Sequence, residues 1–198
     1  MTILEAHREF KFRLDKMDAL NYPNFLPEEI DLVLNNAQER FIKQRYGVNN
    51  IKRQSFEETQ KRTEDLKNVT INAVLTPLAY ASDNIDLNAR FLTLPTNHWF
   101  TVQERCNITC TICGSSVTNL VEVIPTSHSE FSKVIKDPFK QPTETKVLRL
   151  MEAGRVELIS SCTIVDYRMR YVKQPTPVSI TTNTTFELSE HTHSEIVD

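Results

Sequence analysis

The chain has 198 residues, of which 39% are hydrophobic and 25% charged, and its formal net charge is −3. That length is enough for one large domain or two small ones, and the composition is that of an ordinary globular protein. The slight acidic excess argues against a general nucleic-acid-binding protein, because such proteins usually carry a large positive charge.

Several function classes are excluded by what the sequence lacks. It has only three glycines, Gly47, Gly114 and Gly154. Phosphate-binding loops, dinucleotide-binding turns and nucleophile elbows all need clustered glycines, so none of them can be built here. No apolar run reaches the roughly 18 residues that a transmembrane helix needs, and the first residues have no signal-peptide core. We therefore expect a protein that is made and assembled in a cytoplasm.

The N-terminal part predicts helices. Residues 2–18 have apolar side chains near helical spacing. A stronger helix begins at Pro27, a favoured first-turn residue, and Ile30, Leu34 and Phe41 recur along one face. We expect Gly47 to end it.

A second capped helix should follow the central one. Ser55 and Glu58 have the spacing of a capping box for a helix that runs to about Lys67. Together these segments define a helical module over residues 1–67.

After Asn68 the pattern changes to alternating apolar and polar residues, which is typical of strands. Ser127 and Glu130 have the spacing of a capping box for a short helix over 127–135. The clearest strand is 163–172, where Tyr167 and Met169 should lie on one face and Arg168 and Arg170 on the other. The predicted extended segments are 69–75, 84–94, 98–113, 117–124, 146–152, 155–160, 163–172 and 175–185.

The end of the chain, 190–198, has the pattern of a helix that begins but has too few residues to be stable alone. We expect either that the chain continues past Asp198 or that this end folds against a partner. The predicted fold is α+β, because helices and strands are segregated along the chain. Its parts are the helical module, a mainly antiparallel β domain over 68–185, and the start of a C-terminal helix or tail over 186–198.

Cysteines are the first candidates for chemistry. Cys110 and Cys113 are separated by two residues, as in half of a zinc knuckle, and Cys106 lies nearby. A complete site would need Cys162 or His128 as its fourth ligand. The competing interpretation, which we favour, is that these are buried thiols on one face of a strand, because a single Cys-x-x-Cys pair is weak evidence for a metal.

Other polar residues are less specific. His191, His193 and Glu195 could bind a metal, but a spacing of two does not fit a helix, and a polar helix start is the simpler interpretation. His7 and His98 have no identifiable partner, and no carboxylates are paired on an apolar background. Arg168 and Arg170, beside Asp166, indicate a solvated strand face or a contact with a neighbouring subunit or DNA. We expect no catalytic residue and no cofactor.

At this point the residues suggest a family. The chain resembles the head-to-tail connector, or ring, proteins of crAss-like tailed bacteriophages. The segments that carry the resemblance are 25–31, 35–41, 45–47, 56–62 and 190–198.

The resemblance implies a virion protein that is not an enzyme. It implies a homo-oligomeric ring, of twelve copies, stacked between the portal protein and the adjacent ring proteins of the neck and tail. Genomic DNA would pass through the lumen without sequence-specific binding, and no membrane would be involved. Candidate subunit-interface residues are Ile30, Leu34, Phe41, Arg168 and Arg170.

Two other functions remain as alternatives. One is a zinc-binding nucleic-acid or regulatory module that uses Cys106, Cys110, Cys113 and Cys162. The other, a small hydrolase or redox enzyme, ranks last because it depends only on scattered polar residues.

Overall fold

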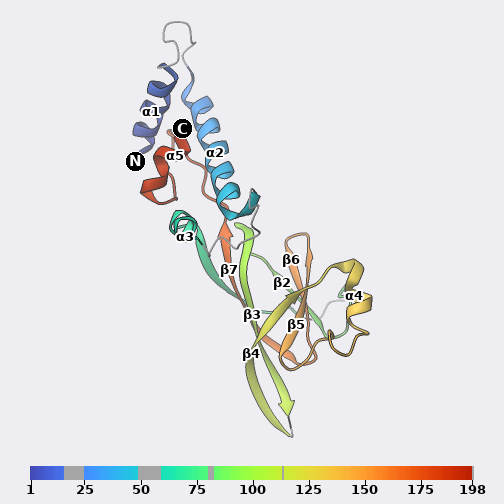
Figure 1. The fold of residues 1–198 in the computed structure, drawn as a ribbon. Helices are drawn as coiled ribbons and strands as arrows, with labels where there is room; N and C mark the ends of the chain where they lie inside the picture. Colours follow the sequence, from blue (N-terminus) through green and yellow to red (C-terminus); the bar gives the residue numbers. More distant parts are fainter. Residues whose placement is uncertain (16–24, 49–58, 80–82, 113, 198) are drawn as a thin grey trace. The chain divides into compact units, whose positions relative to one another are not determined.

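The computed structural model describes residues 1–15, 25–48, 59–79, 83–112 and 114–197. The chain forms two compact units (Figure 1). The helical unit combines Met1–Thr70 with Lys173–Asp198, and the sheet unit is Ile71–Val172. The fold class is α+β, as the sequence predicted.

Both ends of the chain lie in the helical unit (Figure 1). Its short C-terminal helix, α5, contacts both α1 and α2. Among the helices described, none is long and apolar enough to cross a membrane. The unit contains α1 (Ile3–Asp15), α2 (Pro27–Lys43), the π-helical turn η1 (Gln44–Val48), α3 (Gln60–Leu66), the 3₁₀ turn η3 (Glu190–Thr192) and α5 (His193–Val197).

The central helix α2 forms as its sequence predicts. Pro27 occupies its first turn, and the Glu29 carboxylate accepts the Leu26 backbone N–H at 2.9 Å. Its apolar stripe is buried within the helical unit. The α-helix ends at Lys43 rather than at Gly47, because the backbone of the next five residues winds into the wider η1 turn.

The other helices agree with their predicted positions, but their starts do not all use the expected caps. The helix predicted over 2–18 is observed to Asp15, and residues 16–18 lie outside the described part of the chain. The predicted capping box of Ser55 and Glu58 also lies outside it, and α3 is described from Gln60. Ahead of α4 (His128–Val134), Ser127 makes no capping hydrogen bond.

The sheet unit is built on a seven-stranded sheet in the order β1-β7-β3-β4-β5-β6-β2. The pairs β3–β4, β5–β6 and β2–β6 are antiparallel, and β4–β5 is parallel. The predicted mainly antiparallel character is therefore confirmed. The strands are β1 (Thr70–Leu75), β2 (Ala89–Thr93), β3 (His98–Ile112), β4 (Ser115–Pro125), β5 (Lys146–Glu152), β6 (Arg155–Ile159) and β7 (Thr163–Lys173).

Two hairpins, β5–β6 and β3–β4, form part of the sheet. Ala153 and Gly154 join β5 to β6 with φ angles of 34° and 82°, and Gly makes the second of these conformations inexpensive. The β3–β4 hairpin pairs residue by residue from Arg105 with Glu122 to Ile112 with Ser115. This hairpin is long and projects from the rest of the sheet unit (Figure 1).

Only the last part of the extended segment predicted over 84–94 is a strand, namely β2.

The main core of the sheet unit lies on the inward face of the strands. On β7, Tyr167, Met169 and Tyr171 are buried while Arg168 and Arg170 are exposed, which confirms the predicted alternation for these residues. Val165, which the same alternation would place on the inward face, is 45% exposed. The same core includes Cys106, Ile108, Cys110, Val121, Val123, Val147, Val156 and Leu158.

The C-terminal segment differs most from its prediction. Residues 175–185 were expected to be extended, but Ser179 and Thr184 form an isolated bridge that closes a tight loop. The α2 side chains of Asn35 and Asp31 accept the backbone N–H groups of Val178 and Ile180 at 2.7 and 3.0 Å. These N–H groups are therefore used by the chain itself rather than left for the sheet edge of a neighbour.

Candidate functional site

The outer face of the sheet carries a shallow groove edged by arginines. Alternation along each strand turns one set of side chains of β1, β7, β3 and β4 away from the core. We call the exposed set Val74, Arg105, Leu120, Arg168 and Arg170 the arginine face. The groove has a volume of about 380 Å³ and is lined by Asn72, Ala73, Val74, Gln103, Arg105, Leu120, Arg168, Met169 and Arg170.

The charges on the arginine face are mostly positive. Arg168 Nε donates to Asp166 at 3.1 Å, and the second oxygen of that carboxylate accepts from Asn107 at 2.9 Å. Arg170 Nε donates to the neutral amide oxygen of Asn72 at 3.0 Å. Together with Arg105, which is opposite Glu122 in the β3–β4 register, the face has three cations against two carboxylates.

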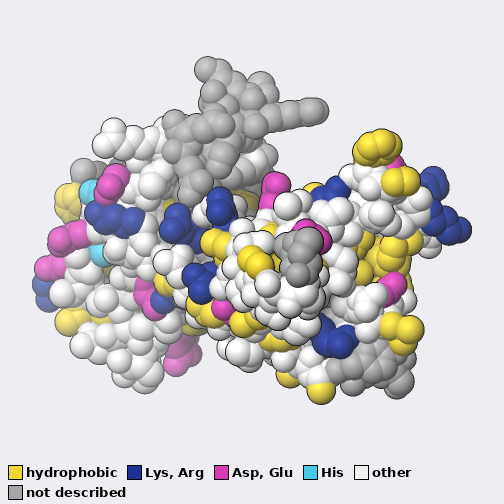
Figure 2. All heavy atoms as spheres, turned by 90° about the horizontal axis from the view of Figure 1, so that it is seen from below, with side chains coloured by type: hydrophobic (Ala, Val, Ile, Leu, Met, Phe, Trp, Pro, Cys, Tyr) yellow, Lys and Arg dark blue, Asp and Glu magenta, His cyan; other side chains and the backbone are white. Residues whose placement is uncertain are grey.

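Apolar side chains add to this surface. Val74 is 63% exposed and Leu120 is 44% exposed. Figure 2 shows that hydrophobic side chains reach the surface among basic and acidic ones on the side it draws. An exposed face that mixes aliphatic side chains with arginine is typical of protein contact surfaces, because arginine is enriched and lysine depleted there.

The helical unit has an exposed face of the opposite sign. On α2 and the residue before it, Leu26 is 60% exposed, Leu32 63% and Val33 46%. Glu28 and Glu29 lie beside them in the first turn, where the helix dipole favours negative charge. We call these five residues the α2 face.

The interface candidates named from the sequence fall into two groups. Ile30, Leu34 and Phe41 are buried within the helical unit of the isolated chain, and Ile30 is completely inaccessible. Arg168 and Arg170 are exposed on the arginine face. The exposed apolar residues of α2 are therefore those of the α2 face. They lie on the opposite side of the helix from Ile30, Leu34 and Phe41. A role of all five candidates in a subunit contact stays a prediction.

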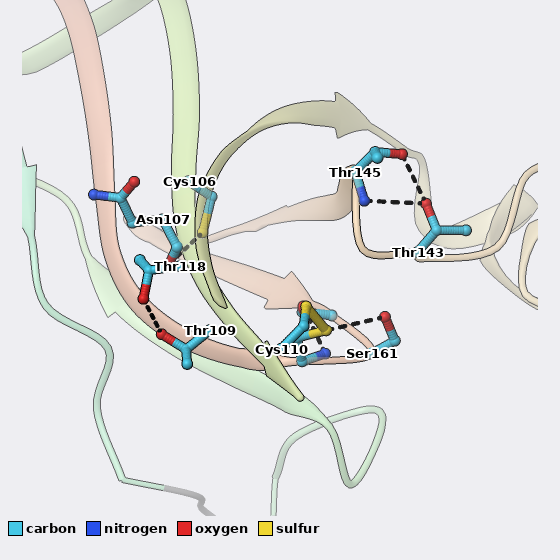
Figure 3. The surroundings of a disulfide bond; sticks show 10 residues. Cys106, Asn107, Thr109, Cys110, Thr118, Thr143, Thr145 and Ser161 are labelled. Carbon is cyan, nitrogen blue, oxygen red and sulfur yellow. Dashed lines mark hydrogen bonds between the residues drawn. A yellow bond between two sulfur atoms is a disulfide. The ribbon is translucent and has the colours of Figure 1, made fainter. Parts of the chain in front are cut away.

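The cysteines do not form the zinc site considered from the sequence. Cys110, on β3, and Cys162, just before β7, form a disulfide with a Cα–Cα distance of 5.0 Å (Figure 3). Their sulfurs are therefore not available as thiolate ligands. Cys106 is a free, buried thiol, as the competing interpretation expected, and Cys113 lies outside the described residues. Within the described ranges, no three metal-ligating side chains cluster.

The environment of Cys106 makes it unreactive. Burial, together with the nearby Asp166 carboxylate, raises the pKa of its thiol to about 12. Nucleophilic and metal-binding cysteines need the thiolate form. Cys106 is therefore a packing residue of the core.

The histidines are each engaged in separate contacts. His191 Nε2 lies 2.9 Å from the Asp65 carboxylate, and His193 Nε2 lies 2.9 Å from the Leu188 carbonyl oxygen. Glu195 instead pairs with Arg45. His191, His193 and Glu195 therefore do not converge on one point, which is what the proposed metal site would require.

The remaining histidines also have protein partners. His7 Nε2 lies 2.7 Å from the Asp31 carboxylate, and His128 Nε2 lies 3.0 Å from the Met151 carbonyl oxygen. His98 lies 2.9 Å from the Thr101 hydroxyl, and burial lowers its pKa. The partner of His7 lies 24 residues away in the sequence, which explains why it could not be named in advance, whereas the partner of His98 is only three residues away and was missed.

One buried polar cluster of the sheet unit had no signal in the sequence. Glu104 lies on the inward side of β3, where its carboxylate pairs with Arg149 of β5. Burial raises the pKa of Glu104, although Arg149 opposes this, and burial also raises the pKa of Tyr167 beside them. Tyr167 is completely buried, whereas Glu104 and Arg149 are largely buried and also line a pocket of about 660 Å³, and their ion pair joins β3 to β5.

These observations describe an α+β protein with an arginine-rich sheet face and a helix face that is acidic and apolar. The chain belongs to the family of phage tail ring proteins 3/4 of the crAss phages, because that family model matches residues 1–198. It is thus a ring-type structural component of a bacteriophage virion.

Two relatives illustrate the similarity. Ring protein 3 of Bacteroides phage crAss001 is 30% identical over 165 residues, which cover 79% of this chain and 70% of that protein. Ring protein 4/5 of the same phage is 24% identical over 200 residues, which cover 97% of this chain and 80% of that protein. The resemblance inferred from the sequence segments is confirmed.

Proposed function

We propose that copies of this chain form a closed ring in the neck of the phage particle, between the portal protein and the tail, and that the genome passes through its lumen. The observation that carries the proposal is the match of the whole chain to a family of ring proteins. In this role the chain is a structural component and not a catalyst. Assembly takes place in the cytoplasm of the bacterial host, and twelve copies close the ring.

The surface of the chain supports such an assembly. A closed ring is held by heterologous contacts, in which one patch of a subunit meets a different patch of the next. The arginine face and the α2 face are two such different patches, and they lie on separate units of the chain. A net charge of −3 also suits a channel for DNA, because acidic walls do not hold phosphates.

Electron microscopy of intact particles tests the proposal directly. A reconstruction of the neck should show this chain as a ring below the portal, and symmetry expansion should give its copy number. Native mass spectrometry of the purified protein, alone and mixed with the portal protein, should show a ring or a ring–portal complex. A chain located elsewhere in the particle, or absent from it, would refute the neck position.

A further inference from the structure

We propose that the arginine face of one copy receives the α2 face of a second copy of this chain, and that this head-to-tail contact is the repeating interface of the ring. The inference depends on the ring proposed above and names the surfaces that build it.

Charge complementarity is the first argument. The arginine face has Arg105, Arg168 and Arg170 against two carboxylates, whereas Glu28 and Glu29 dominate the first turn of α2. Complementary potentials favour the docking of unlike faces. Contacts between two identical faces would place like charges together, so a symmetric dimer through either face is disfavoured.

The apolar side chains give the second argument. Each face contains aliphatic residues that the fold of the single chain leaves exposed, notably Val74 and Leu120 on the sheet and Leu32 and Val33 on α2. A helix that lays its apolar residues into a shallow groove is a common mode of recognition. The groove on the sheet has this form, with apolar residues between basic ones.

The two faces also meet the topological requirement of a ring. A head-to-tail assembly needs two distinct patches on every subunit, so that each copy offers both. Here the patches belong to different units, and each is solvent-exposed within its own unit. Every copy therefore has one face of each kind.

A charge-swap experiment tests the inference. Asn36 is exposed on α2 one turn beyond Leu32 and Val33. The variant Glu28→Arg/Asn36→Arg therefore makes this side of the helix basic and keeps Glu29, whose carboxylate caps the helix. The variant Arg168→Glu/Arg170→Glu makes the sheet face acidic. Each variant alone should need at least about tenfold more protein to assemble than wild type, because its own two faces now repel.

Mixing the two variants should restore assembly. In an alternating array, every basic helix meets an acidic sheet, and every acidic helix meets a basic sheet. Native mass spectrometry should then show oligomers that contain both variants in equal numbers. Circular dichroism of each variant at low concentration verifies that the separate chains are folded.

A matched control fixes the interpretation. Lys133→Glu/Lys136→Glu makes the same change in charge as Arg168→Glu/Arg170→Glu, on and next to α4, at two exposed positions outside both faces. It should assemble as wild type does. Normal assembly of either swapped variant alone, or no rescue on mixing, would overturn the interface while leaving the ring itself intact.

A second measurement applies even if the purified protein assembles weakly. A photo-crosslinking phenylalanine at position 120, in a mixture of ¹⁴N- and ¹⁵N-labelled chains, should give mixed-isotope crosslinks to residues 26–36. Interchain crosslinks to other segments would overturn the proposed interface. A lack of any interchain crosslink, in solution and in purified particles, would instead count against the ring.

Discussion

Arg45 and Asp65 form an ion pair in the helical unit, with Arg45 Nε 2.9 Å from Asp65 Oδ2. Asp65 is completely buried, and its other oxygen lies 2.9 Å from His191 Nε2. Arg45 also pairs with Glu195 of α5. This network joins the end of the central helix to α3 and to the C-terminal turns, so the last residues are fixed by the chain's own side chains.

Removing Asp65 should loosen the C-terminal segment. Asp65→Ala leaves Arg45 partly buried without its carboxylate, and we expect the free energy of unfolding to fall by about 3 kcal/mol. Asp65→Asn, which keeps an acceptor for His191, should lower the free energy of unfolding by less. Urea denaturation followed by circular dichroism measures both. The control is Glu64→Ala, at an exposed neighbouring position, which should change stability little, and equal losses for Glu64 and Asp65 would contradict the prediction.

The buried Asp31 carboxylate should be a second point of weakness. It lies 2.7 Å from His7 Nε2 and accepts the Ile180 N–H at 3.0 Å, so it connects α1, α2 and the C-terminal loop. Asp31→Ala leaves both partners unpaired, and we expect the free energy of unfolding to fall by about 2 kcal/mol. Asn36→Ala, on the exposed side of the same helix, is the control. Faster hydrogen exchange at Ile180 in Asp31→Ala alone would show that the loop is released.

The Cys110–Cys162 disulfide should contribute strongly to the sheet unit. It closes a loop with a sequence separation of 52, for which chain entropy gives a stabilisation of up to about 4 kcal/mol. Cys110→Ser/Cys162→Ser should therefore unfold at lower urea concentration, as should wild type in dithiothreitol. Peptide mapping without reductant should recover the linked pair. Reductant should not change the stability of the double variant, and a clear change would show that another disulfide contributes.

The thiol of Cys106 should give the stability a specific alkaline pH dependence. Its pKa is about 12 in the folded chain and 9.0 is its ordinary value, so the folded state retains the proton more strongly. The stabilisation that this raised pKa gives is fully present below pH 9 and is lost as the pH rises from 9 toward 12. Linkage gives a fall in the free energy of unfolding of about 1 kcal/mol between pH 8 and pH 9.5.

The comparison for this prediction is Cys106→Ala, which lacks the titrating group. Its free energy of unfolding should fall by about 1 kcal/mol less than that of wild type over the same pH interval. Identical pH profiles for the two proteins would mean that Cys106 ionises normally in the folded chain.

Local patterns in the sequence were enough to locate most elements. The spacing of Ile30, Leu34 and Phe41 defined α2, and the alternation from Tyr167 to Tyr171 defined β7. Helix and strand periods are properties of neighbouring residues, so a short window contains the information. The same alternation located β5 and β6, and the spacing of Ser127 and Glu130 located α4.

The sequence alone determined the α+β class, most of the helices and strands in their order, and the family. Only the tertiary structure decided that Cys110 pairs with Cys162, that Asp31 and Asp65 each hold a distant segment, and that Leu26, Leu32 and Val33 are the apolar residues α2 leaves exposed. These relationships join residues far apart along the chain. They depend on how the whole polypeptide closes on itself, and no local period encodes that closure.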